Sequence, residues 1–180
     1  MGTHPEISEA LAEWVSKQPV FFVASAPLAD GHVNLSPKGL DTFRVLGPMH
    51  VAYLDLTGSG AETIAHVQQN GRITLMWCSF GENMRIVRFY GTATAVGLDE
   101  ARASGLLDHF PELPGARCII DVSVDRVASS CGFGLPIFVG EPQERSTLID
   151  WAEKKGPDGL DTYQRTKNAV SIDGLTAFQP

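Results

Sequence analysis

The positions of apolar residues along the chain predict a series of β-strands. Residues 20–24 form a short apolar run rich in Val and Phe, and residues 32–36 alternate between polar and apolar side chains. Both patterns are typical of strands, because successive side chains of a strand point to opposite faces. On the same grounds we expect strands at residues 49–56, 72–80, 85–96 and 118–127, and a short segment at 44–46.

Apolar residues at helical spacing predict helices between and after these strands. The predicted helices cover residues 7–17, 60–69, 99–110, 146–155 and 160–167. Proline follows the first and third of them, and Gly156-Pro157 separates the last two. Strands joined mostly by turns do not follow the βαβ alternation of a doubly wound sheet. The pattern therefore predicts a mainly β fold, an antiparallel barrel with peripheral and C-terminal helices.

Length and charge narrow the class of protein. The 180 residues suffice for one domain, which we expect to span residues 1–180, with a barrel core at about 14–130 and a C-terminal helical extension at about 140–180. The net charge of −7 argues against nucleic acid as a partner. The chain begins without the basic and apolar segments of a signal peptide, and no apolar run reaches the ~20 residues of a membrane helix. We therefore expect a cytoplasmic protein without a membrane partner.

The cysteines and histidines give no sign of a metal site or a nucleophile. The three cysteines are widely separated and form no CxxC pair, which is typical of a reducing compartment. The five histidines lack the spacing of metal ligands. Cys131 lies in a glycine-rich turn with no histidine nearby in sequence, so a structural loop is the favoured interpretation. No side chain stands out as a catalytic acid or base.

The segment from Thr57 to Thr63 is the strongest local candidate for a binding site. A predicted strand runs into Thr57, Gly58, Ser59 and Gly60 and then directly into a helix. Small residues let backbone N–H groups approach a ligand, and a helix N-terminus favours an anion. The hydroxyls of Thr57, Ser59 and Thr63 add further donors for a phosphate. The alternative is an ordinary tight turn with a helix cap.

A polar row forms the second candidate. With the two-residue period of a strand, Asn34, Ser36 and Lys38 point to one side. Such a row suits a phosphate or a ring carbonyl, although a solvated sheet face is the alternative. On the strand at 85–96, Arg85 and Arg88 fall on opposite faces, so one of them can face an interior ligand, and we take Arg88 as the candidate.

The order of these pieces resembles a known family. The strand with Ser36-Pro37-Lys38-Gly39, the strand ending at Tyr53, the hydroxyl-rich turn, Asn70-Gly71-Arg72 and the long strand from Arg85 follow one another as in the FMN-binding split β-barrel family of pyridoxamine 5′-phosphate oxidase. The resemblance covers roughly residues 14–127. It is closest to a bacterial and fungal branch that carries a Ser-Cys-Gly-aromatic-Gly turn, which matches residues 130–134 here.

The resemblance implies a homodimer with FMN at the subunit interface. Lys38 and Tyr53 match the residues that end the family's two flavin-contact strands, and the turn from Thr57 to Thr63 stands where the FMN phosphate is held. The chain also departs from the oxidase, because Glu62-Thr63 replaces an Arg-Lys pair, and Val33 and Ile86 replace an arginine and a glutamine. The C-terminal Arg-x-His substrate signature is absent, so oxidation of vitamin B6 is not the expected activity.

These features predict an FMN-dependent oxidoreductase that acts on an unidentified small molecule. Three alternatives remain open. The cofactor could be a deazaflavin that serves a reductase, or the chain could be a non-catalytic flavin- or haem-binding protein for storage, sensing or stress. A dimeric interaction module without any flavin is the third.

Overall fold

A curled antiparallel sheet forms the body of the protein. The computed structural model describes residues 2–81, 83–140 and 142–177, and these residues contain one eight-stranded sheet. The strands follow the order β3-β2-β6-β7-β8-β5-β4, and β1 adds to β8. Their bounds are Gly2–His4 (β1), Phe21–Ser25 (β2), Asn34–Lys38 (β3), Phe43–Gly47 (β4), His50–Leu56 (β5), Arg72–Cys78 (β6), Ile86–Gly97 (β7) and Ala116–Ser130 (β8). The predicted mainly β, antiparallel split-barrel class is confirmed.

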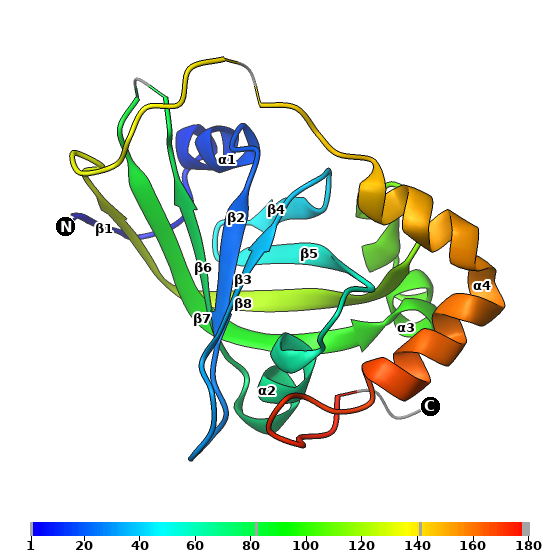
Figure 1. Cartoon of the computed structure of the whole chain (residues 1–180). Helices are drawn as coiled ribbons and strands as arrows, with labels where there is room; N and C mark the ends of the chain where they lie inside the picture. Colours follow the sequence, from blue (N-terminus) through cyan, green and yellow to red (C-terminus); the bar gives the residue numbers. More distant parts are fainter. Residues whose placement is uncertain (1, 82, 141, 178–180) are drawn as a thin grey trace.

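Helices cover the ends and one side of this sheet (Figure 1). Helix α1 and helix α2 lie at opposite ends of the curl, and the C-terminal helix α4 lies along its side. Their bounds are Glu9–Ser16 (α1), Glu62–Asn70 (α2), Leu98–Ala103 (α3) and Thr147–Lys167 (α4), with a 3₁₀ turn at Leu106–His109. Among the described helices, none combines the length and the apolar character that crossing a membrane requires.

The packing of the core explains why the sequences of strands β5 and β8 are almost continuously apolar. Val51, Tyr53 and Ile120 face the main cluster inside the curl, whereas Leu54 and Ile119 face a second cluster under α3. Strands β5 and β8 are therefore buried on both faces. Such strands lose the polar alternation that a half-exposed strand shows.

The ends of the predicted elements shift by up to three residues, as for the strand predicted at 32–36 and observed at Asn34–Lys38, and three further differences stand out. Strand β1 was not predicted, because its three residues carry no β pattern and are ordered by pairing with β8. The predicted helix at 99–110 is interrupted at Gly105, whose φ of 76° is left-handed. The predicted break between the last two helices is a kink inside α4, where Gly156 takes φ 65° and ψ 174°. The helix resumes directly at Pro157, a residue suited to a first helical turn.

A charged cluster is buried where β5 ends. Asp55 is 1 % exposed, and its carboxylate contacts the Lys38 ammonium at 3.0 Å and the Arg117 guanidinium on its other oxygen. Arg117 also donates to the carbonyl of Gly60 at 3.0 Å. Burial by itself would raise the pKa of Asp55, but the charges and hydrogen bonds of Lys38 and Arg117 outweigh it and lower this pKa. The cluster thus joins β3, β5 and β8 to the segment before α2.

Replacing Gly91 by alanine should destabilise the fold. A Cβ at Gly91 would collide with the backbone carbonyl of Ser123, which cannot swing away as a side chain can. We expect Gly91→Ala to lower the free energy of unfolding by about 1–3 kcal/mol, measured by urea titration. Gly97→Ala on the same strand is the control, because a Cβ there meets nothing within 4 Å. Equal stabilities of the two variants would contradict this account of β7.

Replacing Asp55 by asparagine should remove a pH-dependent part of the stability. The folded pKa of Asp55 lies below the unfolded value of about 3.9, so the carboxylate stabilises the fold at neutral pH. That contribution is lost as the pH falls below about 4 through the folded pKa. We expect Asp55→Asn to cost about 3–5 kcal/mol at pH 7, because the half-buried Lys38 and the buried Arg117 both lose a carboxylate that neutralises their charge.

The gap between wild type and Asp55→Asn should shrink in urea titrations at pH 3. Asp41→Asn is the control, since the Asp41 side chain is 67 % exposed in its pair with Arg44. Its effect should stay within about 1 kcal/mol. A constant gap between wild type and Asp55→Asn at both pH values would refute the role of the carboxylate charge.

Candidate functional site

The turn between β5 and α2 carries free backbone donors. Within the described residues, the N–H groups of Gly58, Ser59 and Gly60 donate no hydrogen bond, and Ser59 is exposed. The Thr57 hydroxyl, which the sequence predicted as a donor for a phosphate, is already engaged within the chain. It is buried, donates to the carbonyl of Gly115 at 2.8 Å and accepts from Gln164 at 2.9 Å. The turn therefore offers backbone N–H groups and one serine hydroxyl, while Thr57 anchors it.

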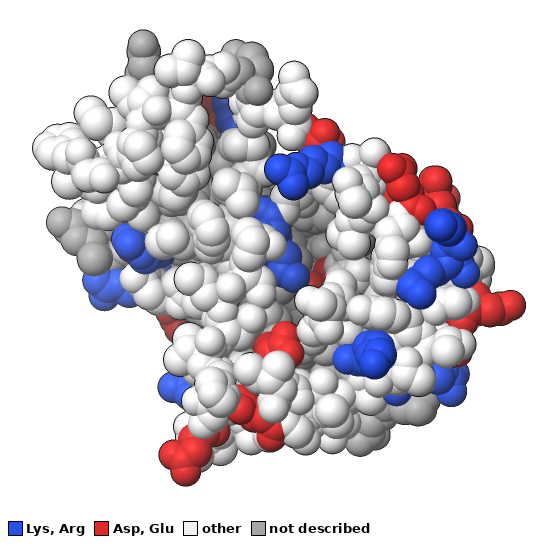
Figure 2. Space-filling model, in the orientation of Figure 1, with Lys and Arg blue, Asp and Glu red and all other residues white. Residues whose placement is uncertain are grey.

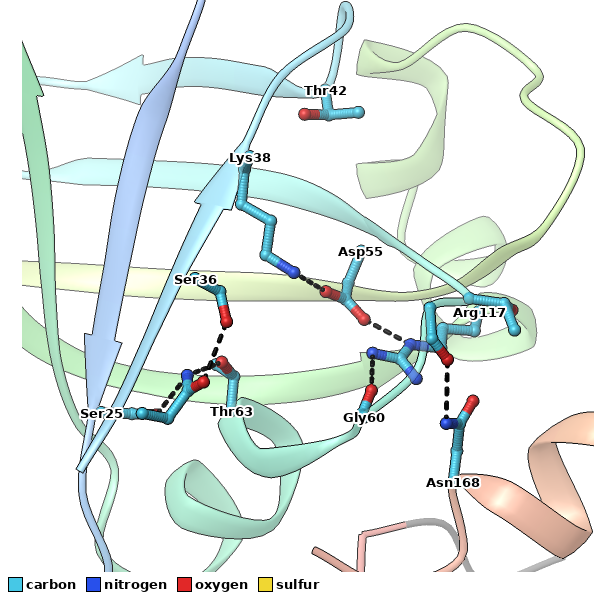
Figure 3. Close-up of polar contacts among 12 residues, drawn as sticks. Ser25, Ser36, Lys38, Thr42, Asp55, Gly60, Thr63, Arg117 and Asn168 are labelled. Atoms are coloured by element: carbon cyan, nitrogen blue, oxygen red, sulfur yellow. Dashed lines mark hydrogen bonds and ion pairs between the residues drawn. The ribbon is translucent and has the colours of Figure 1, made fainter. Parts of the chain in front are cut away.

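Two long-range hydrogen bonds fix the shape of this turn (Figure 3). Arg117 binds the carbonyl of Gly60, and the amide of Asn168 donates to the carbonyl of Gly58 at 3.1 Å. Asn168 follows helix α4 and is fully buried. The carbonyls on both sides of Ser59 are thus engaged within the chain, whereas the described N–H groups of Gly58, Ser59 and Gly60 donate no hydrogen bond.

The row on β3 has the predicted alternation, and it faces the inside of the barrel. Asn34, Ser36 and Lys38 are half-buried, whereas Leu35 and Pro37 are exposed. Asn34 donates to Thr63 at 3.0 Å and to Ser25 at 3.3 Å, and it accepts from Ser36 at 2.9 Å. Both donors of this amide and its oxygen are thus engaged within the chain. A ligand at Asn34, Ser36 or Thr63 would have to compete with this network.

Lys38 and Tyr53 lie close to each other at the C-terminal end of the β3 row. The Lys38 ammonium lies 5.8 Å from the centre of the Tyr53 ring, and its side chain remains 22 % exposed. The Tyr53 side chain has no exposed surface and packs against Phe21 in the core. Burial, and secondly the charge of Asp55, raises the pKa of the Tyr53 hydroxyl. In the single chain Lys38 can reach a ligand, and the Tyr53 side chain cannot.

The fold does not place Arg88 beside the other residues that the sequence predicted for the binding site. Cross-strand partners share a face of the sheet, and Arg88 lies in the row of Pro37, Phe22 and Met76. Lys38 lies in the neighbouring row with the buried Phe21, on the opposite face. Arg88 instead hydrogen-bonds Ser130 at 3.3 Å. The registers of three strand pairs, from β3 through β2 and β6 to β7, therefore separate Arg88 from the turn.

A large cleft opens between the barrel and helix α4. Its volume is about 1400 Å³, and Figure 2 shows the hollow with cationic side chains along its rim. The barrel side contributes Lys38, Leu54, Leu56 and the turn from Thr57 to Ser59. The other side is built by Arg145, Leu148, Trp151, Lys155 and Tyr163. Apolar and aromatic surface beside a few polar groups is the usual composition of a small-molecule site.

Several residues of this region were not identified from the sequence. Asp55 and Arg117 hold the turn, and Ser25 continues the β3 network to His66 at 3.0 Å. Burial lowers the pKa of His66, so this imidazole is neutral at pH 7. A signal for the ion cluster was present, because Asp55 interrupts an apolar strand and Arg117 directly precedes another. A charge in a buried strand demands a partner, but the sequence does not say which.

Comparisons with known proteins agree with this architecture. The sequence profile of the pyridoxamine 5′-phosphate oxidase family matches residues 7–131. A pyridoxamine 5′-phosphate oxidase family protein of Aspergillus flavus, ustO, is 40% identical over an alignment of 188 positions, which covers 96% of this chain and 76% of that protein.

Two solved structures share the fold at lower sequence identity. A candidate pyridoxamine 5′-phosphate oxidase from Lactobacillus delbrueckii has a TM-score of 0.56 at 23% identity, over 71% of this chain and 99% of that one. HupZ from Group A Streptococcus has a TM-score of 0.53 at 21% identity, over 67% and 91% of the two chains. These structures support the fold alone. Together with the profile match and the fungal relative, the sheet, the turn and the β3 row place this chain in the pyridoxamine 5′-phosphate oxidase family.

Proposed function

We propose that this protein binds FMN and is an FMN-dependent oxidoreductase that acts on a small molecule. The observation that carries the proposal is the cleft, in which the turn at 57–59 and Lys38 stand beside apolar and aromatic walls. A cleft of about 1400 Å³ exceeds the usual volume of a single-ligand pocket, so it has room for a flavin and a flat substrate together.

The chemistry of FMN fits the residues on the barrel side. Its phosphate needs hydrogen-bond donors and a cation, and the free N–H groups of Gly58 and Ser59 lie on the same wall as the Lys38 ammonium. Lys38 uses one donor on Asp55 and keeps two for a ligand. Leu54 and Leu56 offer apolar contact for the ring system. When bound, the flavin itself supplies the redox chemistry, and this chain positions it and excludes water.

The residues that line the cleft bear differently on the two alternative cofactors, haem and a deazaflavin. Haem needs an axial ligand of the type His, Met, Cys or Tyr, and among the described lining residues only Tyr163 is of these types. Its ring packs against Trp151 and the Lys155 ammonium. A deazaflavin presents the same flat ring and phosphate, so the cleft suits it as well as FMN.

One observation favours a second function, a non-catalytic flavin carrier. Among the described lining residues, Glu144 is the single carboxylate, and neither His nor Cys is present. The protein therefore contributes few groups for acid–base catalysis, and a role in flavin storage, sensing or stress needs none.

We further propose that the protein is a cytoplasmic homodimer. The described chain leaves apolar side chains exposed at the edge of the sheet and in the loop after β8. Val33 is 74 % and Val139 100 % exposed, and Leu35, Phe133 and Phe138 are also exposed. A second copy that covers these residues would remove them from water. All three cysteines are free thiols, which suits a reducing compartment.

Gly58→Val tests the proposed phosphate cradle. A Cβ at Gly58 meets only the carbonyl of Leu56 at 4.0 Å, so the fold can accept the side chain, which would occupy the place of a ligand. In titrations of FMN followed by flavin fluorescence, we expect the dissociation constant to rise at least about tenfold, as for a steric cost near 1.4 kcal/mol. Gly97→Val, which points into open space, should bind as the wild type does.

An unchanged dissociation constant for Gly58→Val would remove the turn from the site. The absorbance spectrum of the purified protein decides the cofactor, because a flavin, a deazaflavin and a haem absorb in different bands. A spectrum without a chromophore, together with no FMN binding in the titration, would refute the proposed function.

Light scattering tests the dimer. The chain mass is 19.4 kDa, so we expect a species of twice that mass, and replacing the exposed Val33 or Leu35 by a charged residue should shift it toward the monomer. A species with the mass of a single chain would overturn the proposed homodimer.

A further inference from the structure

The C-terminal extension builds one wall of the cleft, and the profile of the family does not reach it. The profile match ends at residue 131, whereas Arg145, Trp151, Lys155 and Tyr163 lie beyond it. This wall therefore lies outside the segment that the family profile covers. Its residues bear on which molecule enters the cleft next to the flavin.

The wall is fixed to the barrel. In the second half of α4, Gln164 donates to Thr57, and Asn168 after the helix donates to the carbonyl of Gly58. In the first half, Ala152 is 1 % exposed and lies against Gly115. The second half of α4 is thus held at the turn that we propose for the FMN phosphate. The first half is held at Gly115, whose carbonyl accepts from Thr57 of that turn.

The kink in α4 creates an aromatic platform for a cation. Trp151 and Tyr163 are twelve residues apart, yet their ring centres lie 5.1 Å apart at 83°, because the helix bends at Gly156. The Lys155 ammonium lies 5.1 Å from the centre of the Trp151 ring and 5.2 Å from that of Tyr163. The rings are neutral, so they position this ammonium without cancelling its charge.

The charge of this wall contrasts with that of the whole chain. Among the described residues, neither Lys155 nor Arg145 has a carboxylate within salt-bridge distance. Glu144 is the single described carboxylate that lines the cleft, against the cations Lys38, Arg145 and Lys155. In a protein of net charge −7, this concentration of cations favours a negatively charged ligand.

We propose that Lys155 and Arg145 bind the negative group of the substrate, and that the substrate is a small planar molecule carrying a carboxylate or phosphate. This inference rests on the proposed function, since the flavin would occupy the barrel side of the cleft. The ammonium and guanidinium provide the charge-assisted hydrogen bonds that an anionic group needs. The aromatic and aliphatic side chains beside them favour a flat ring over an extended chain.

The test uses the full chain loaded with FMN, with benzoate and phenyl phosphate as probes and benzamide as their neutral match. Binding is followed by the change in flavin absorbance and by calorimetry. We expect at least one anion to bind at least about tenfold more tightly than benzamide, as charge-assisted hydrogen bonds imply. A preference for benzoate or for phenyl phosphate distinguishes a carboxylate from a phosphate substrate.

Variants of Lys155 and Arg145 test whether the anion binds at these two side chains. Lys155→Gln combined with Arg145→Gln should weaken the preferred anion about tenfold or more and leave benzamide binding and the FMN dissociation constant unchanged. Lys154→Gln is the matched control, an exposed lysine of the same helix that does not line the cleft. Equal binding of anions and benzamide, or an equal loss in the control, would overturn the proposal.

Two readouts keep this inference separate from the proposed function. If the double variant weakens FMN rather than the anion, the two cations bind the cofactor phosphate and the substrate assignment is wrong. If the wild type binds no FMN, calorimetry on the same chain still measures whether the wall formed by α4 binds the anions. Anion binding without FMN would then support the cationic site while refuting the flavin function.

Discussion

The buried carboxylate of Asp55 constrains the end of the barrel on which the site is built. A carboxylate removed from water is stable only when cations and donors surround it. Lys38 on β3 and Arg117 on β8 meet this need, and each is thereby held in place. Arg117 then reaches the carbonyl of Gly60 and fixes the start of α2. One charge thus determines where the exposed face of Lys38 and the N–H groups of the turn lie.

The turn at 57–60 is shared by the two parts of the chain. The barrel holds it through Arg117, and the C-terminal extension holds it through Gln164 and Asn168. All of these contacts go to Thr57 or to backbone carbonyls, so the N–H groups of Gly58 and Ser59 stay free for a ligand. The same contacts set the distance between α4 and the sheet and so give the cleft its width.

Polar groups inside the barrel serve two different purposes. Asn34, Ser36 and Thr63 satisfy one another and continue through Ser25 to a buried, neutral His66. This network replaces water for groups that would otherwise be buried without partners. Lys38 stands at its edge and combines a structural bond to Asp55 with access to the cleft.

The sequence by itself determined most of the elements, because strand and helix periods are local properties of a chain; β1 is an exception, since it is ordered by its pairing with β8. The alternation of Asn34, Ser36 and Lys38 and the small residues after β5 were visible in it, as was the break at Gly156. Tertiary structure decided the partners. Asp55 meets residues 17 and 62 positions away, and the register of β3, β2, β6 and β7 puts Arg88 on the wrong face for the turn. Such pairings depend on how distant strands pack, and no local pattern encodes that packing.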